Sequence, residues 1–337
     1  MLNVTLYTRK ECKLCDEVKA DLNELQSQYP HRLTEIDIDT DPALRAKFGQ
    51  SIPVIEVGPF SLKAPITKQK LKMTLGAASD RVNQLEKLDD PVYKYQTQRG
   101  KTVTTGDRVS FWIAKRYLLI LNLFMFIYVG LPLLAPTLMK VGAETPANII
   151  YRIYKPLCHQ FGFRSFFLFG EQPFYPLAEA RVSGYKTYEE ATGFANLSDP
   201  YSMARFDARN HIGDEVMGYK VALCERDIAI YLAILMFGII FGLTGRRLKS
   251  LHWMLWLLLG IAPFGLDGFS QLFSQFNWEW LSALVPYRES TPFLRTFTGA
   301  LFGLFTAWFA YPNIEESMSE TRQYYIKKFA VNQTSEK

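Results

Sequence analysis

The sequence predicts a small soluble α/β domain followed by an all-α membrane domain of about four transmembrane helices. Roughly the first hundred of the 337 residues are rich in charge and alternate like a soluble domain. The remainder contains several uninterrupted apolar stretches that are too long for strands. Hydrophobic residues make up 48% of the chain and aromatic residues 15%, which excludes a disordered chain because so much apolar surface must be buried.

The soluble half alternates strands and helices. Residues 3–8 (NVTLYT) predict a short buried strand, and residues 12–27 predict a helix because leucine and valine recur there at helical spacing. The later predicted elements are a strand over 33–38, a helix over 41–48, strands over 52–57 and 60–63, and a helix over 68–88. This is the β-α-β-α-β-β-α order of a unit with a central sheet.

A Cys-x-x-Cys pair, Cys12 and Cys15, lies at the start of the first predicted helix. The free amides and the dipole of a helix N-terminus favour the thiolate of the first cysteine, so Cys12 is the predicted nucleophile. Arg9, Lys10 and Lys13 add positive charge nearby. Cys15, one helical turn later, is placed to resolve a mixed disulfide. The alternative, half of a zinc ribbon, lacks a second Cys-x-x-Cys in this sequence.

Residues 2–88 resemble the glutaredoxin-like proteins of the thioredoxin fold, through LYTRKECKLCDEVK, EIDIDTDPALRAKFG and SIPVIEV. The resemblance implies an α/β thioredoxin-like domain in which Pro53 follows a cis peptide bond beside the reactive pair. It also implies that the backbone of Ile52 pairs with an extended substrate. An ordinary edge-strand proline is the alternative for Pro53. The segment GPFSLKAPITKQ lacks the Gly-Gly-x-Asp pattern with which glutaredoxins hold glutathione, so the expected partner is an unspecified protein or low-molecular-weight thiol.

The apolar stretches divide the remaining chain into four predicted spans, over residues 118–139, 228–243, 251–273 and 294–311. Lysine and arginine precede the first span, fill the connection after the second and follow the fourth, so we expect both termini in the cytoplasm. The start of the chain lacks a signal-peptide pattern, which agrees. The net charge of +5 then reflects topology and contact with the lipid membrane, and no nucleic-acid partner is expected.

The predicted organisation follows from these spans: a glutaredoxin-like domain over 1–88, a linker and juxtamembrane segment over 89–116, a membrane domain over 117–313, a long outer loop over 140–226 and a cytoplasmic tail over 314–337. Within the outer loop, residues 147–169 are aromatic and mildly amphipathic but interrupted by charge and proline. An interfacial or re-entrant element suits them better than a fifth span.

Two further cysteines, Cys158 and Cys224, are predicted to meet at the outer surface, and three interpretations remain open. A disulfide between them suits the oxidising side of a membrane. A metal site made by Cys158, His159, Cys224 and Asp227 would suit zinc or copper, although the sequence establishes no cofactor with certainty. The third interpretation is two buried, unreacted cysteines beside a histidine bonded to backbone.

The third span carries Asp267, with Gln271 one turn later on the same face. An ionisable residue at membrane depth is expensive, so a paired or functional role is the default hypothesis. We expect Asp267 to pair with Arg295 of the fourth span. The alternative is that Asp267 lies at the outer interface.

Residues 115–313 resemble a family of uncharacterised bacterial integral membrane proteins. The shared segments are PLCHQFGFRSFFLFG, MGYKVALCERDIAIYLA, PFGLDGFSQLF and TPFLRTFTGALFG. Relatives usually carry a Cys-x-x-Cys pair in the second segment, where this sequence has Cys224-Glu225-Arg226-Asp227. The resemblance implies a fold and a site but no reaction.

Three functions fit these observations. The first is a membrane-tethered thiol–disulfide oxidoreductase that uses Cys12 and Cys15. The second is a metal-binding or transporter-like membrane protein whose glutaredoxin-like domain is a sensor, with Asp267, Gln271 and Arg295 lining a polar path. The third is a scaffold whose outer loop, residues 141–220, is long enough for a small folded cap that binds a partner.

Overall fold

The computed structural model describes residues 1–88, 91–100, 102–199, 202–275 and 287–333. It divides into two compact units. One unit comprises Met1–Tyr117 together with Glu316–Lys337, and the other comprises Leu118–Glu315. An N-terminal mixed α/β domain is therefore followed by a mostly helical region, which confirms the predicted fold class.

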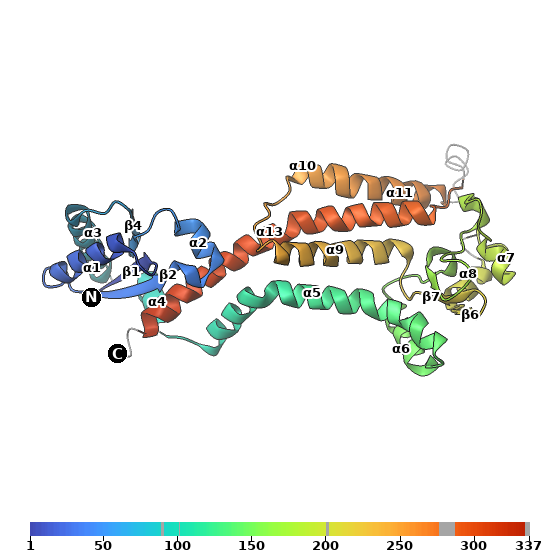
Figure 1. Ribbon diagram of the computed structural model, residues 1–337, viewed down its shortest axis with the longest axis horizontal. Coiled ribbons are helices and arrows are strands. Elements are labelled where there is room, and N and C mark those ends of the chain that lie inside the picture. The colour runs from blue at the N-terminus through green and yellow to red at the C-terminus, as the bar shows by residue number, and fades with distance from the viewer. Residues whose placement is uncertain (89–90, 101, 200–201, 276–286, 334–337) are drawn as a thin grey trace. The chain divides into compact units, whose positions relative to one another are not determined.

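The first unit contains a four-stranded sheet in the order β2-β1-β3-β4. Its strands are β1 (Leu2–Thr8), β2 (His31–Asp37), β3 (Val54–Val57) and β4 (Phe60–Lys63). The first two strands are parallel, whereas β3 is antiparallel to both β1 and β4. The crossover between the parallel strands is α1 (Lys13–Leu25), as a parallel pair requires (Figure 1).

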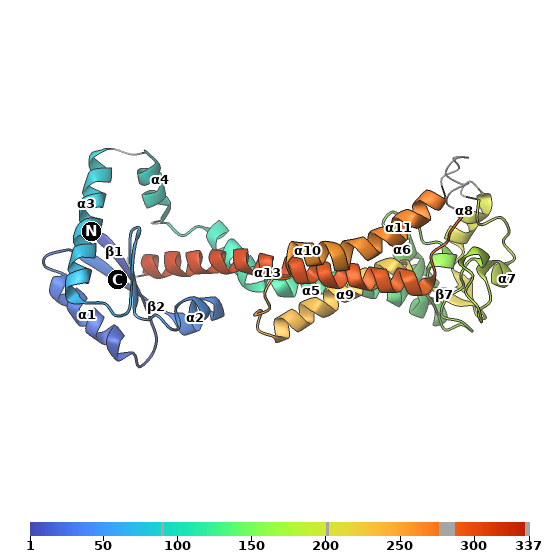
Figure 2. The same cartoon turned by 90° about the horizontal axis from the view of Figure 1, so that it is seen from above.

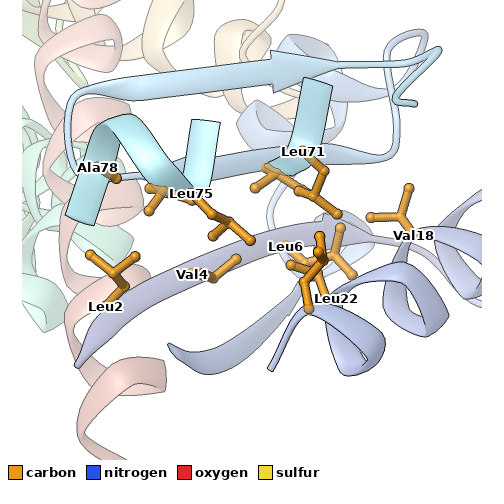
Figure 3. Packing of buried hydrophobic residues seen from close by; sticks show 11 residues of the cluster. Leu2, Val4, Leu6, Val18, Leu22, Leu71, Leu75 and Ala78 are labelled. Carbon is orange, nitrogen blue, oxygen red and sulfur yellow. The ribbon is translucent and has the colours of Figure 1, made fainter. Parts of the chain in front are cut away.

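One face of the sheet is covered by α1 and α3 (Lys68–Lys87). Figure 3 shows Val18 and Leu22 of α1 and Leu71 and Leu75 of α3 close to the side chains of β1. Leu22, Leu71 and Leu75 are fully buried, which follows from their helical spacing. This cluster is the main core of the domain.

The other face of the sheet is covered by α2 (Pro42–Phe48), the 3-10 turn η1 (Ile38–Thr40) and the end of α13 (Pro292–Gln333). Ile326 and Ala330 of α13 pack against the cluster that contains Tyr7, Leu44 and Phe48. The residues predicted as a cytoplasmic tail are thus helical as far as Gln333, and residues 334–337 lie outside the described chain.

Ion pairs join α13 to the rest of this unit. Arg322 Nε lies 3.0 Å from Asp41 Oδ2, Lys327 Nζ 2.7 Å from Glu56 Oε2, and Lys328 Nζ 2.7 Å from Asp107 Oδ2. Asp107 belongs to α5 (Thr105–Lys140), which follows α4 (Pro91–Gly100). The described part of the predicted linker is largely helical. Its polar helices are held by contacts within the unit. Residues 89, 90 and 101 lie outside the described chain.

The second unit contains the apolar helices. In the described chain, four helices are long and apolar enough to cross a membrane: Thr105–Lys140, Glu225–Leu243, Trp253–Ser274 and Pro292–Gln333. They are α5, α9 (Glu225–Leu243), the continuous run of α10 (Trp253–Leu255), η4 (Trp256–Ile261) and α11 (Ala262–Ser274), and α13. The apolar parts of these helices run alongside one another in both views (Figures 1 and 2).

Two glycines allow α13 to approach α9 closely. A Cβ on Gly303 would lie 2.2 Å from the carbonyl oxygen of Ile230, and one on Gly299 would lie 2.7 Å from that of Arg226. Gly299 and Gly303 have the small-x-x-x-small spacing that lets membrane helices pack backbone to backbone. A side chain at either position requires the two helices to separate.

The predicted outer loop is a folded cap. Its helices are α6 (Glu144–Tyr154), α7 (Tyr188–Thr192) and α8 (Met203–Asn210), with the 3-10 turns η2 (Gly162–Arg164) and η3 (Ala178–Ala180). Strands β5 (Phe167–Leu168), β6 (Gly213–Asp214) and β7 (Gly218–Lys220) pair in the order β5-β7-β6. Aromatic residues including Phe163, Phe167 and Tyr188 form its core. The segment 147–169, expected to be an interfacial or re-entrant element, is α6 followed by irregular chain that packs into this cap.

We predict that Gly303→Ala destabilises the membrane domain by about 1–3 kcal/mol, because the new methyl group collides with the backbone of α9. Gly130→Ala is the matched control, since nothing lies within 4 Å of a Cβ at that position in α5. Thermal unfolding of both variants in detergent measures the difference. Equal transition temperatures for the two variants would contradict the close packing.

Candidate functional sites

Cys12 and Cys15 form a disulfide with an S–S distance of 2.11 Å. Cys12 is the N-cap residue of α1, and its carbonyl accepts hydrogen bonds from the amides of Cys15 and Asp16. Cys15 is 1% exposed, whereas Cys12 is partly exposed. Cys12 is therefore the more accessible residue of the pair.

The positive charge expected around this pair is only partly available to it. Arg9 Nε lies 3.2 Å from Asp39 Oδ2 in an ion pair, while Lys10 and Lys13 are exposed. In the reduced protein, a Cys12 thiolate would therefore be stabilised mainly by the positive end of the α1 dipole.

Pro53 and the cysteine pair lie at the same end of the sheet. The Ile52–Pro53 peptide bond is cis. Val54, which opens β3, pairs with Tyr7 near the end of antiparallel β1, and the loop to Cys12 follows directly after β1. The register thus brings the start of β3 and the end of β1 together. The substrate-binding role of Ile52 and Pro53 stays a prediction.

The second cysteine site lies where the cap meets the membrane helices. Reactive atoms of Cys158, Cys224 and Asp227 lie within 4.8 Å of one another. Cys224 is the N-cap residue of α9, and its Sγ accepts from the amide of Asp227 at 3.5 Å. Both cysteines are free thiols, so the structure brings together the predicted pair without the predicted disulfide.

The two thiols are not equivalent. A hydrogen bond from Cys224 lowers the pKa of the Cys158 thiol, while the same hydrogen bond and burial raise the pKa of Cys224. His159, the fourth predicted ligand, stands outside this group, and its ring stacks on Phe161 at a centroid distance of 5.7 Å.

A cavity of about 370 Å³ adjoins these thiols. It is lined by both cysteines, by His159 and Asp227, and by side chains of the membrane helices. Those side chains include Arg226, Phe264, Gln271 and Arg295. Charged side chains and two thiols thus line one cavity of the second unit.

The buried charges beside the cavity are arranged around two carboxylates. Glu289 lies 2.7 Å from Arg164 and accepts at 3.0 Å from Gln271, and it also pairs with Arg295. Arg295 additionally lies 3.1 Å from Glu225. Glu225, Glu289 and Arg295 are nearly inaccessible to solvent, so each of these charges depends on its partners, whereas the Arg164 side chain is partly exposed.

The expected ion pair between Asp267 and Arg295 was wrong. Asp267 lies 2.6 Å from Arg226 and 2.8 Å from Arg288, and it accepts from the hydroxyl of Ser290. Arg295 is already held by two glutamates. Both members of the predicted pair are therefore neutralised, but by neighbours in the chain segments 225–226 and 288–290.

The residues that complete this cluster were not predicted from the sequence: Arg164, Glu225, Arg226, Arg288, Glu289 and Ser290. The sequence feature that could have identified most of them is the charge immediately beside the predicted spans, in CERD and in YRESTP. Paired charges of both signs at the ends of neighbouring spans would have indicated a buried network.

The fold and the two cysteine sites define a glutaredoxin-like domain joined to a membrane domain of four candidate spans. Residues 3–77 match the family described as a Glutaredoxin-like domain (DUF836). Residues 215–309 match the family described as a Predicted membrane protein (DUF2085). These matches confirm the fusion that the sequence predicts.

Among solved structures, the chain is similar to the Northeast Structural Genomics target protein XcR50 from X. campestris, with 29% sequence identity and a TM-score of 0.20. The alignment covers 22% of this chain and 96% of that chain. No curated protein matches the sequence.

We predict that stability falls in acid through Glu289. Burial alone would raise its pKa, but the charges of Arg164 and Arg295 outweigh burial, so the pKa lies below its ordinary value. The stabilisation is therefore complete above the unfolded pKa of about 4.3 and is lost as the pH falls through the lower folded value. Glu289→Gln should lower the free energy of unfolding near neutral pH by about 3–5 kcal/mol and flatten this acid dependence.

Urea unfolding of the membrane domain at neutral and acid pH measures this effect. Glu171→Gln in the cap is the control, because Glu171 forms an exposed ion pair with Lys186 whose loss changes stability by about 0–1 kcal/mol. A Glu289→Gln variant as stable as this control would show that the buried cluster does not hold the domain together.

Proposed function

We propose that the protein is a membrane-tethered thiol–disulfide oxidoreductase with Cys12 as nucleophile and Cys15 as resolving thiol. The observation that carries the proposal is the disulfide between a partly exposed Cys12 at a helix N-terminus and a buried Cys15. Such an arrangement makes the first thiol accessible and acidic and protects the second. The client is a protein or a low-molecular-weight thiol.

The reaction exchanges two electrons. A client thiolate attacks Cys12 Sγ, the bond between Cys12 and Cys15 breaks, and Cys15 leaves as a thiolate. A second client thiolate then attacks the client sulfur bound to Cys12 and releases Cys12 as a thiolate. The client dithiol is thus oxidised to a disulfide while the pair is reduced, and the reverse sequence reduces a client disulfide.

The surroundings of the pair assign roles to two further residues. In the proposed complex, the backbone of Ile52 pairs with an extended client segment and Pro53 shapes the groove, since both follow the turn that leads into β3. The membrane domain holds this reaction at the lipid surface. We place both termini on the cytoplasmic side, because Arg246, Arg247 and Lys249 fill the connection between α9 and α10.

We predict that Cys15→Ser accumulates a mixed disulfide with its client, because Cys12 can still attack a client disulfide and no second thiol resolves the adduct. Cys12→Ser should abolish both adduct formation and turnover. Non-reducing electrophoresis of the full-length protein after acid quenching detects the adduct. Cys158→Ser is the control and should behave like the unmodified protein.

Exchange that survives in Cys12→Ser at the unmodified rate would contradict the assignment of the nucleophile. Adducts that form equally well on the Cys158 thiol would contradict the assignment of the site.

A second candidate function is metal binding by the membrane domain, with the glutaredoxin-like domain as its sensor. The observation that favours it is the group of Cys158, Cys224 and Asp227. Two sulfurs and one carboxylate oxygen suit zinc, and the two sulfurs alone suit monovalent copper. The lowered pKa of Cys158 favours a thiolate ligand. His159 could contribute only after its ring leaves Phe161.

The transporter version of this candidate has less support. It requires Asp267, Gln271 and Arg295 to line a polar path, yet Asp267 is held by two arginines and Arg295 by two glutamates. Charges that are paired in this way stabilise the packing of the helices and are not available to bind a transported ion.

We predict that Cys158→Ser and Cys224→Ser each lose bound zinc or copper, while Asp227→Asn weakens binding less because one neutral oxygen replaces a charged one. Metal content of purified protein, measured together with free thiols, gives the result. His159→Ala is the matched control and should retain the metal. Protein that contains no metal with both outer thiols free would exclude this candidate.

A further inference from the structure

The cap encloses a second cavity, of about 260 Å³, that none of the proposed reactions uses. It lies between α6, α8 and β7. Four cationic side chains line it, and the remaining lining residues are neutral: Asn148, Tyr151, Gln160, Asn210 and Ile212. The cations are Arg152, Lys155, Arg209 and Lys220.

These four cations have no carboxylate partner among the described residues. Lys155 Nζ donates to the side-chain oxygen of Asn210 at 2.7 Å, and Arg209 donates to the carbonyl of Lys155 at 2.8 Å. Lys220 Nζ donates to the carbonyls of Gln160 and Arg209. The Nε atom of Arg209 is buried without a hydrogen-bond acceptor in the described structure. The hydrogen-bond acceptors of Lys155, Arg209 and Lys220 in the described chain are therefore neutral oxygens, which leave the positive charges uncompensated.

The uncompensated positive charge affects the pKa of Lys220. Lys220 is 1% exposed, and burial together with the charges of Lys155 and Arg209 lowers its pKa to about 7, although Cys158 acts in the opposite direction. Burial among like charges favours the neutral amine of Lys220, and an anion placed beside it would favour the ammonium form. The cavity therefore offers an anion four cationic side chains that have no carboxylate partner among the described residues.

The position of the cavity indicates where that anion comes from. Helix α6 starts four residues after α5 ends, and the hydroxyl of Tyr154 donates to the carbonyl of Tyr128 in α5 at 2.9 Å. The ring of Tyr128 also contacts that of Tyr231 in α9, at a centroid distance of 4.6 Å. Helix α6 is therefore bound to the membrane helices near the end of α9 that faces the cap.

Helix α6 has an exposed apolar stripe beside the cavity. Ile149 is 50% exposed and Ile153 56%, and they lie one turn apart, with Leu157 exposed just beyond the helix. The opposite side, with Ala147, Ile150 and Tyr154, is buried against the cap and the membrane helices. Exposed isoleucines next to a cationic cavity are typical of a helix that lies in the membrane interface.

We propose that this cavity binds the phosphate group of an anionic phospholipid from the outer membrane leaflet. Arg152 and Lys155 meet the headgroup at the mouth of the cavity, and Arg209 and Lys220 donate to phosphate oxygens inside it. The acyl chains lie along Ile149, Ile153 and Leu157. The bound lipid fixes α6, and hence the cap, on the membrane.

The test uses full-length protein reconstituted in an equal mixture of phosphatidylcholine and phosphatidylglycerol, extracted in mild detergent and analysed by native mass spectrometry. Phosphatidylglycerol should be retained in preference to phosphatidylcholine. Each Lys or Arg near a membrane surface contributes about 1 kcal/mol, so Arg152→Gln should weaken retention roughly fivefold and the Arg152→Gln/Lys155→Gln double variant roughly 30-fold.

Arg181→Gln is the matched control, since Arg181 is an exposed cation of the same cap outside the cavity. Arg152 is exposed and lies at the cavity mouth, so its variant keeps the fold, and an unchanged melting temperature verifies this. Equal retention of the two lipids overturns the proposal. Retention of phosphatidylglycerol that the double variant leaves unchanged overturns it as well, as does binding of inorganic phosphate with no preference among the lipids.

Discussion

The end of the membrane domain that carries the cap depends on one buried carboxylate. Glu289 pairs with Arg164 of the cap and Arg295 of α13, and it accepts from Gln271 of α11. A carboxylate with almost no solvent contact is stable only while these donors stay in place. They hold the cap against two membrane helices, and the thiols of Cys158 and Cys224 face the cavity that this arrangement leaves.

The sequence predicted the soluble domain almost completely because its signals are local. Cys12 and Cys15 are three residues apart, and apolar spacing fixed α1 and α3 within one or two residues of their observed ends. The pairing of Asp267 was missed for the opposite reason. Arg226 and Arg288 lie 41 and 21 residues away from it, and periodicity cannot choose among several arginines at span ends. The helical form of residues 316–333 was missed likewise, because ion pairs such as Arg322 with Asp41 become visible only in three dimensions.

The cap connects its two cavities through Gln160. Its side chain donates to the carbonyls of Tyr151 and Ala222, and its own carbonyl accepts from Lys220. Gln160 also lines both the cavity beside the thiols and the cavity with the four cations. Gln160 would therefore lie between an anion bound near Lys220 and the cavity that contains the Cys158 thiol. Both cavities are therefore lined by the same buried glutamine, whose side-chain nitrogen has two carbonyl acceptors.

The proposed function requires Cys12 and Cys15 to be a working redox pair on a membrane protein. A redox titration of the full-length protein in defined thiol buffers, with acid quenching and mass determination of the thiol adducts at each cysteine, tests it most directly. We expect a reversible two-electron transition of this pair between about −120 and −270 mV, the range of known dithiol oxidoreductases. A pair that stays oxidised below about −300 mV would be a structural disulfide and would contradict the claim.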